Sequence, residues 1–289
     1  MENVIECQNV RKTFKGFELK DLSLTVKKGY VNGFIGGNGA GKSTTIKLIM
    51  NLLKPDSGSV SVFGLNYKEH EKEIKERIGF VYDDNIYYEN LTLQEMKRII
   101  SMSYRNWDEK VFKHYVEYFE LPLKKAIKHF SKGMKMKVSL AFALSHHAEL
   151  IIMDEPTSGL DPIFRRELLD ILHELMQDEN KTIFFSTHIT TDLDRIADYI
   201  SFIHNGELIF TKEFYKIEEE YAIVKGTLDL LDREVESEFV AVKKTNSGFE
   251  ALTDNKNRVT NIFGDTVVIE KPSLEDIMYY TKQGGLSYA

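Results

Sequence analysis

The stretch GGNGAGKST occupies residues 36–44 and decides how the rest of the chain is interpreted. It matches the pattern G-x-x-x-x-G-K-[ST] and lies between the apolar run VNGFI (31–35) and a segment whose apolar residues recur at helical spacing. In such a loop the glycines let backbone N–H groups turn toward phosphate oxygens, and the following helix start adds a favourable dipole. Lys42 is then expected to reach the β- and γ-phosphates, and Ser43 to hold Mg²⁺. The alternative, an ordinary glycine-rich turn, does not account for the strand–loop–helix context.

A second stretch, LIIMDEPTSGLD (150–161), places two carboxylates at the end of an apolar run. Such runs are typical of parallel strands buried on both faces, and open α/β sheets bind their ligands beyond the carboxyl ends of these strands. Asp154 is therefore predicted to hold Mg²⁺, and Glu155 to act as general base for an attacking water. His188 follows the next apolar run and is predicted to reach the same γ-phosphate, although a lone histidine at a strand end is more often structural.

A third stretch, HFSKGMKMKV (129–138), is basic in a chain that is acidic overall. Ser131 precedes a helical pattern, so Ser131, Lys132 and Gly133 are predicted at a helix N-terminus, where backbone N–H groups attract anions. A basic patch for nucleic acid is one alternative, but no aromatic residues are interleaved with the lysines on this helix. The other alternative is a capped helix with solvated lysines, and the stretch alone does not decide between it and an anion site.

The composition limits the class of protein. The chain has 289 residues, enough for one large domain and a smaller one, and its net charge of −7 argues against general attraction to nucleic-acid phosphates. The single cysteine, Cys7, excludes an internal disulfide and fits a reducing compartment. The N-terminal sequence lacks the features of a secretory signal, and no segment approaches the roughly 18 uninterrupted apolar residues of a membrane span. A role at a membrane would therefore depend on a partner chain.

Strands alternate with helices over residues 31–200, which predicts an α/β domain with a mainly parallel sheet. Residues 92–146 are mostly helical in pattern, and the segment from Thr92 to Glu95 fits a capping box. The dipeptide Asn205-Gly206 stands between two β-prone runs and predicts a hairpin.

The composition changes near residue 215. The charged segment FYKIEEEYAIVKG (214–226) is expected to form a linker helix. The short β-prone runs that follow predict a small α+β appendage, and Ser273 is expected to cap its last helix. Nothing in this appendage points to chemistry.

Together these motifs resemble those of an ATP-binding-cassette (ABC) ATPase, and they occur in that family's order. GGNGAGKS corresponds to the Walker A motif, FSKGM to the signature, LIIMDE to Walker B, SGLD to the D-loop and STH to the switch histidine. The resemblance covers about residues 1–215. It implies a P-loop NTPase fold with a mainly parallel core sheet, an antiparallel β subdomain and a helical subdomain at about 85–146, followed by the α+β appendage at 216–289.

The resemblance also implies ATP and Mg²⁺ as ligands and a second ATPase subunit, identical or homologous, as a partner. In this family two nucleotide domains associate head to tail, and each ATP lies between the Walker A motif of one chain and the signature of the other. The residues expected to bind ATP in the same chain are Phe14, stacking on adenine, and Gly36, Asn38, Gly39, Ala40, Gly41, Lys42, Ser43 and Thr44. Those expected to act at the ATP of the opposite chain are Ser131, Lys132, Gly133 and Met134 of the signature. Asp161 would be the D-loop residue. Glu155 and His188 would be catalytic, and the Mg²⁺ ligands would be Ser43, Asp83 and Asp154.

The signature differs from the family's usual LSGGQ. It is FSKGM (130–134) here, with Lys132 in place of a glycine and Met134 in place of a glutamine. A serine–lysine–glycine signature is familiar in the drug- and peptide-exporter branch, which includes ATPases for antimicrobial-peptide immunity and for phenol-soluble-modulin export. The C-terminal segment PSLEDIMYYTK also resembles that branch.

Two further positions depart from the family pattern. The glutamine expected after IGFVY is replaced by Asp83, which is shorter and charged and has Asp84 beside it. The proline common in the Walker A motif is Gly37 here.

The resulting hypothesis is an ATP-hydrolysing subunit of a bacterial membrane exporter for peptides or amphipathic, drug-like compounds. It would work in the cytoplasm, peripherally on the inner face of the cell membrane, with a polytopic membrane permease and without nucleic acid. The alternative is a soluble ABC ATPase switch that regulates translation or gene expression, a class that usually carries two nucleotide domains in one chain where this sequence shows one. A GTPase would need an N-K-x-D motif, which the sequence lacks.

Overall fold

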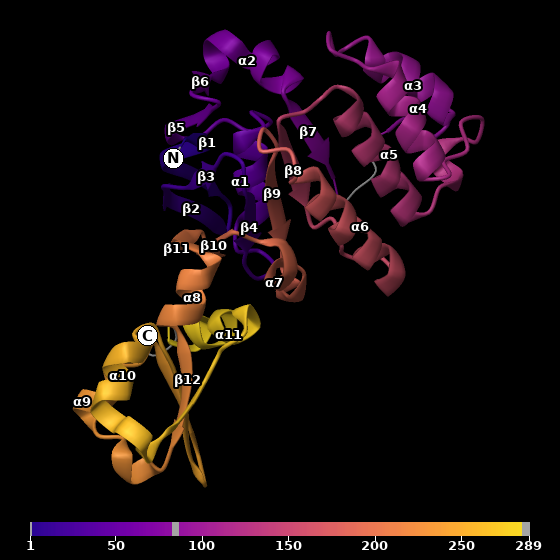
Figure 1. Cartoon of the computed structure of the whole chain (residues 1–289). Coiled ribbons are helices and arrows are strands. Elements are labelled where there is room, and N and C mark those ends of the chain that lie inside the picture. Colours follow the sequence, from indigo (N-terminus) through magenta and orange to yellow (C-terminus); the bar gives the residue numbers. More distant parts are fainter. Residues whose placement is uncertain (1, 83–86, 285–289) are drawn as a thin grey trace. The chain divides into compact units, whose positions relative to one another are not determined.

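The computed structural model describes residues 2–82 and 87–284. The chain divides into two compact units, Met1–Thr211 and Lys212–Ala289 (Figure 1). The boundary therefore falls slightly before residue 215, where the composition changes. Among the described residues, no helix combines the length and the apolar composition needed to cross a lipid bilayer.

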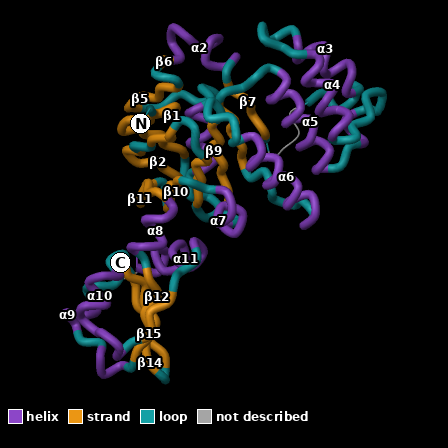
Figure 2. The backbone as a smooth tube through the Cα atoms, in the orientation of Figure 1, coloured by secondary structure: helices purple, strands orange, loops and turns teal. Residues whose placement is uncertain are grey.

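The core of the first unit is a sheet with the strand order β11-β10-β4-β9-β8-β7. Figure 2 draws the strands in orange. The pairs β10–β4, β4–β9, β9–β8 and β8–β7 are all parallel. Strands β4, β8 and β9 are buried along their whole length. This burial is typical of strands in the middle of a parallel sheet that is covered on both faces. The bounds are β4 Val31–Ile35, β7 Ile78–Val81, β8 Leu150–Asp154, β9 Thr182–Thr187, β10 Tyr199–His204 and β11 Glu207–Glu213. The predicted α/β fold with a mainly parallel sheet is confirmed.

The hairpin between β10 and β11 turns at Asn205-Gly206, whose φ angles are 47° and 80°. Two positive φ angles are those of a type I′ turn, whose twist matches that of the flanking strands. A Cβ atom on Gly206 would lie 1.9 Å from the carbonyl oxygen of Glu18, so only glycine fits this position. The predicted hairpin is confirmed.

A second, antiparallel sheet in the same unit has the order β2-β1-β5-β6, with β3 also paired to β1. Its buried face shares one hydrophobic core with α1 and the central sheet, so that Ile5, Ile46 and Phe184 belong to the same cluster. Phe34 of β4 and Ala40 of the loop between β4 and α1 belong to the same core, so close packing helps to fix the position of this loop. The bounds are β1 Asn3–Phe14, β2 Phe17–Leu22, β3 Thr25–Lys27, β5 Ser57–Val62 and β6 Leu65–Asn66.

Five helices of the first unit, α2 to α6, begin at a residue whose side chain caps the helix, whereas α1 and α7 do not. The capping box at α3 is present: Glu95 N donates to Thr92 Oγ1 over 3.2 Å, and Thr92 N donates to Glu95 Oε2 over 2.8 Å. Helix α5 packs closely on β7, where a Cβ atom at Gly79 would lie 2.6 Å from that of Ala143. The bounds are α1 Lys42–Ile49, α2 Tyr67–Glu76, α3 Leu93–Ser101, α4 Glu109–Tyr118, α5 Lys132–Ser145, α6 Pro162–Leu175 and α7 Leu193–Ile196.

The second unit is built on an antiparallel sheet with the order β13-β14-β12-β15. Val224, Phe249 and Val259 belong to its own hydrophobic core, which brings β12, β14 and α10 together. The cap of the last helix is confirmed, because Asp276 N donates to Ser273 Oγ over 3.1 Å. The bounds are α8 Phe214–Glu220, β12 Ala222–Gly226, α9 Arg233–Glu236, β13 Ala241–Thr245, β14 Gly248–Thr253, α10 Lys256–Phe263, β15 Val268–Glu270 and α11 Leu274–Gly284.

The expectation of one linker helix over FYKIEEEYAIVKG was wrong for its second half. Helix α8 ends at Glu220, and the next residues form β12, the strand between β14 and β15. Ala222, Ile223 and Val224 are buried there. The charged first half of the segment suggested a helix throughout. The short run from Ala222 to Val224 contains β-branched residues, which are stabilised more by burial between two strands than by continuing an exposed helix.

Cys7 offers a test of the packing in the first unit. It is 2% exposed, and burial raises the pKa of its thiol to about 12, against about 8.5 for an exposed thiol. Because the thiolate is the reactive form, we expect a thiol reagent at pH 8 to label the folded chain at least about 100-fold more slowly than the denatured chain. Mass spectrometry of the labelling time course measures this ratio, and equal rates in the two states would contradict the burial of Cys7.

The raised pKa of the Cys7 thiol also predicts that the free energy of unfolding depends on pH. Above about pH 8.5 the unfolded chain releases a proton that the folded chain retains, so the contribution of Cys7 to the free energy of unfolding should fall as pH rises toward 12. Replacing Cys7 with serine should remove that contribution. Denaturant titrations of both proteins at pH 8 and pH 10 measure the difference.

Candidate functional site

The loop between β4 and α1 forms the floor of the candidate site. Gly39 and Gly41 have φ angles of 78° and 116°, which L side chains rarely adopt. Gly36 is the first residue of this loop, and a Cβ atom on it would meet the carbonyl oxygen of Ile203 at 2.5 Å. Backbone N–H groups at the start of α1 have no partner within the helix, so the loop presents donors where an anion would sit.

A cavity of about 600 Å³ opens above this loop. The predicted site residues that line it are Asn38, Gly39, Gly41, Lys42, Ser43, Thr44, Glu155 and His188. The cavity thus brings residues from the first and second stretches of the sequence into one place. Gly36 and Ala40 do not line it but support the loop, since Ala40 N donates to Gly37 O over 3.1 Å.

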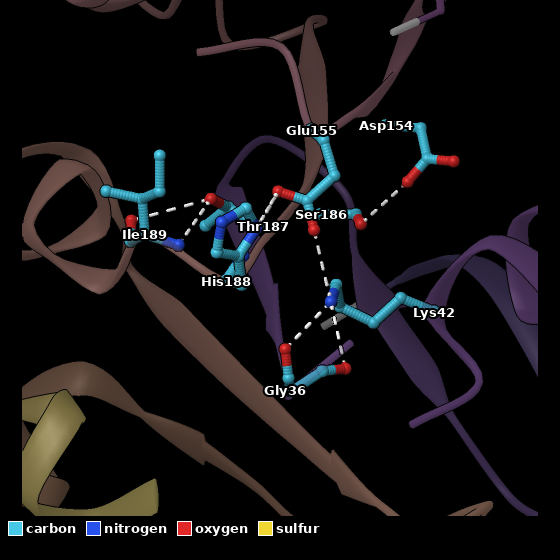
Figure 3. A network of polar contacts seen from close by, with 9 residues as sticks. Gly36, Lys42, Asp154, Glu155, Ser186, Thr187, His188 and Ile189 are labelled. Atoms are coloured by element: carbon cyan, nitrogen blue, oxygen red, sulfur yellow. Dashed lines mark hydrogen bonds and ion pairs between the residues drawn. The ribbon is translucent and has the colours of Figure 1, made fainter. Parts of the chain in front are cut away.

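Lys42 is the central cation of the cavity and is only 6% exposed. Its Nζ atom donates to the carbonyl oxygens of Gly36 and Gly37 over 2.7 and 3.3 Å. It also lies 3.1 Å from Glu155 Oε1 (Figure 3). The ammonium is therefore held at the loop by two neutral carbonyls and one carboxylate.

Glu155 stands directly after β8 with a φ angle of 49°, an uncommon conformation for a non-glycine residue. Its Oε2 atom accepts from His188 Nδ1 over 2.7 Å and from His188 N over 3.2 Å. Figure 3 shows the carboxylate between Lys42 and His188. Glu155 thus links Lys42 of α1 to His188, which follows β9. The carboxylate also fixes the orientation of the His188 imidazole. Such orientation is needed in a side chain that exchanges a proton with a phosphate or a water.

Asp154 is the last residue of β8, directly before Glu155, and is 5% exposed. Burial raises the pKa of its carboxyl, opposed by hydrogen bonds from Ser186 and Ser43 and reinforced by the nearby charge of Glu155. Ser186 Oγ donates to Asp154 Oδ1 over 2.9 Å. The carboxylate and the Ser43 hydroxyl form a pair of adjacent oxygen donors, which is the chemistry that Mg²⁺ prefers. A divalent cation at this position would neutralise charge on a bound nucleotide.

The signature residues lie elsewhere, at the N-terminus of α5. Ser131 caps this helix, and its Oγ accepts from Met134 N over 3.2 Å. A Cβ atom on Gly133 would lie 3.0 Å from the ring of Phe164. None of the predicted signature residues, from Ser131 to Met134, lines the cavity of the same chain.

The D-loop residue Asp161 has a clear structural role in the single chain. It is the N-cap of α6, and its Oδ1 accepts from Ile163 N and Phe164 N over 3.1 and 3.0 Å. Gly159, two residues earlier, is close enough to Lys132 that an added Cβ atom would lie 3.5 Å from its Nζ. The D-loop and the signature helix are therefore neighbours in the first unit.

Phe17 and its neighbour Gly16 line the cavity, whereas the predicted aromatic residue Phe14 does not. Phe14 is 40% exposed at the end of β1 and pairs with Phe17 across the hairpin, with ring centroids 6.5 Å apart. Phe14 is thus a neighbour of a lining residue and does not itself line the cavity. Gly16, Phe17, Gly37 and Ser158 also line the cavity but were not predicted to do so. Gly37 and Ser158 lie within the stretches 36–44 and 150–161, whereas no motif pointed to Gly16 or Phe17. The predicted Mg²⁺ ligand Asp83 lies outside the described residues.

Comparison with known proteins agrees with this geometry. The family described as "ABC transporter" matches residues 19–158. The bacitracin transport ATP-binding protein BcrA of Bacillus licheniformis is 37% identical over 214 residues, which cover 72% of this chain and 69% of that protein. The chain belongs to the ABC transporter family. It is therefore an ATP-binding subunit with ATP hydrolase activity.

Two further relatives extend the comparison of this ABC ATPase. The lantibiotic transport ATP-binding protein SrtF of Streptococcus pyogenes is 32% identical over 222 residues, covering 73% of this chain and 91% of that protein. The ATP-binding cassette MJ0796, solved as a dimer in a post-hydrolysis state with ADP and Pi, superposes with a TM-score of 0.65 at 25% identity, covering 72% of this chain and 98% of that one. The predicted family, fold and enzyme class are confirmed.

Proposed function

We propose that this ABC ATPase drives a bacterial membrane exporter for peptides or amphipathic, drug-like compounds. The observation that carries the proposal is the similarity to ATP-binding proteins named for bacitracin and lantibiotic transport. That similarity extends over nearly three quarters of the chain. The serine–lysine–glycine signature supports the same branch.

The proposed ATP site is completed by a second ATPase subunit, identical or homologous. The signature residues lie outside the cavity of their own chain, yet Ser131 and Gly133 stand at a helix N-terminus suited to an anion. They would contact the γ-phosphate of ATP held by Lys42 of the opposite chain. ATP would then close the dimer, and hydrolysis would open it.

Within one site, each residue has a proposed task. Lys42 would turn from Glu155 to the β- and γ-phosphates, which compete for the same ammonium. Glu155 would then be free to accept the proton of the attacking water, while His188 would donate to the γ-phosphate. Ser43 and Asp154 would hold Mg²⁺, whose charge would screen the phosphates.

The proposed partner in the membrane is a polytopic permease, bound at the inner face of the cell membrane. Residues 85–130, where the described part contains α3 and α4, would form the contact with it. Tagging the chain at its natural abundance, solubilising membranes in mild detergent and purifying with ATP and Mg²⁺ tests this. A polytopic membrane protein in near-equal amount is expected, and a second ATPase would indicate a heterodimer. Recovery from the soluble fraction with ribosomes or nucleic acid would instead favour a regulatory ATPase.

The shared site makes a prediction about mixed dimers. Ser131→Asp keeps a good helix cap but places a negative charge against the γ-phosphate, so we expect a loss of ATP hydrolysis of about tenfold or more. Ser131→Asn, which is equally suited to capping but neutral, is the matched control and should retain most activity. Mixing Ser131→Asp chains with Lys42→Ala chains should restore hydrolysis, because one site of each mixed dimer then has both halves intact. No gain, when cross-linking shows that mixed dimers form, would contradict a site shared between chains.

A further inference from the structure

A polar contact outside the cavity joins α6 to the segment that follows the switch histidine. Arg165 Nε donates to Asp192 Oδ1 over 2.5 Å, and Arg165 Nη2 donates to Thr191 Oγ1 over 2.9 Å. The arginine side chain is 29% exposed, whereas that of Asp192 is 3% exposed. A planar guanidinium that bonds two acceptors at once fixes their direction as well as their distance.

Asp192 depends on this contact. Its second oxygen, Oδ2, is buried and has no hydrogen-bond partner among the described residues. Burying a carboxylate without a partner is costly, and Arg165 is the cation that lies beside this one. The segment Thr190–Asp192 is therefore held at α6 by a group that would be costly to leave unpaired.

Both ends of the contact lead to the candidate site. Arg165 lies in the first turns of α6, whose N-cap is the D-loop residue Asp161. Thr191 lies three residues after His188, whose backbone N and ring Nδ1 both reach Glu155. The short chain between His188 and Asp192 is thus fixed at Glu155 on one side and at Arg165 on the other.

We propose that Arg165 is a positioning residue for ATP hydrolysis, acting through Thr191 and Asp192 to set the position of His188 in the cavity. With the arginine in place, the backbone at residues 188–192 has little freedom, and the His188 ring stays against Glu155. Without it, the buried charge of Asp192 is uncompensated and the segment shifts to solvate it. The same contact carries any displacement of the D-loop, through the rigid start of α6, to the switch histidine.

Steady-state kinetics of the full chain with Arg165→Met test this role. We expect kcat to fall about tenfold or more, while the KM for ATP stays within about twofold, because the loop and Lys42 are untouched. Arg166→Met is the matched control: Arg166 is the next residue of α6, is exposed, and has no ion pair among the described residues. It should hydrolyse ATP at the unaltered rate. A decrease of kcat in both variants, or in neither, would overturn the proposal.

A second comparison separates positioning from a general loss of structure. If Arg165 acts through His188, Arg165→Met should lower the single-turnover rate of the His188→Ala chain by less than about twofold. Equal losses in the two backgrounds would show that the arginine does not act through the histidine. Where Arg165→Met does not fold, Thr191→Ala and Arg165→Lys replace it. Both should lower kcat relative to the unaltered chain, because each disturbs one part of the contact; unchanged kcat in both would overturn the proposal.

Discussion

Glu155→Gln should bind ATP and hardly hydrolyse it. The glutamine side chain has the same shape as glutamate but cannot accept the proton of the attacking water, so we expect kcat to fall by a factor of about 100 to 10,000. ATP binding should remain, because the loop that lines the cavity is unchanged. Lys42 loses only the Glu155 carboxylate, which competes with phosphate for its ammonium. Filter binding of ATP and single-turnover hydrolysis measure the two effects separately.

The same variant should also accumulate as an ATP-bound dimer, since opening depends on hydrolysis in the proposed cycle. Size-exclusion chromatography with ATP and Mg²⁺ should show the dimer, and chromatography without nucleotide should not. Glu174→Gln is a matched control, because Glu174 is exposed on α6 and does not line the nucleotide cavity. A Glu155→Gln chain that hydrolyses ATP normally and stays monomeric would contradict the catalytic-base role.

Much of the candidate site could be predicted because its residues lie in continuous motifs. The loop from Gly36 to Thr44 and the pair Asp154-Glu155 are each short stretches in which spacing determines local geometry. The ion pair between Lys42 and Glu155 could not be predicted in this way. It depends on β9 lying between β4 and β8 in the sheet, and such long-range pairing leaves no local signal.

Other contacts depended on tertiary structure in the same manner. Phe17 lines the cavity because the β1–β2 hairpin pairs it with Phe14, and that register is not visible in the alternation of residues. Arg165 and Asp192 are 27 residues apart and meet only when α6 packs beside the end of β9. In the second unit, β12 was missed because its burial comes from β14 and β15, which follow it in the chain. The sequence shows which residues can do chemistry more readily than it shows which residues support them.

Lys42→Ala should strongly weaken productive ATP binding. The ammonium is buried, is aimed by the carbonyl oxygens of Gly36 and Gly37, and stands where the β- and γ-phosphates would arrive. A hydrogen bond to a charged group contributes about 1.5–3 kcal/mol, so we expect ATP affinity to fall by a factor of about 10 to 100. Hydrolysis should fall further, because the lysine also stabilises charge that develops on the phosphates in the transition state. Isothermal titration with ATP and Mg²⁺ and an ATPase assay measure the two losses.

Lys42→Ala also changes the site when no nucleotide is bound, so a control variant is needed. Removing the ammonium takes away the ion pair at Glu155 Oε1, so the carboxylate keeps His188 but loses its cation. Lys47→Ala removes a positive charge from the same helix, in its last turn and outside the cavity. If the loss of binding came from the net charge alone, both variants would bind ATP equally poorly. If it comes from the geometry of the loop, Lys47→Ala should bind ATP normally, and undiminished turnover in Lys42→Ala would contradict the assignment of this loop to phosphate.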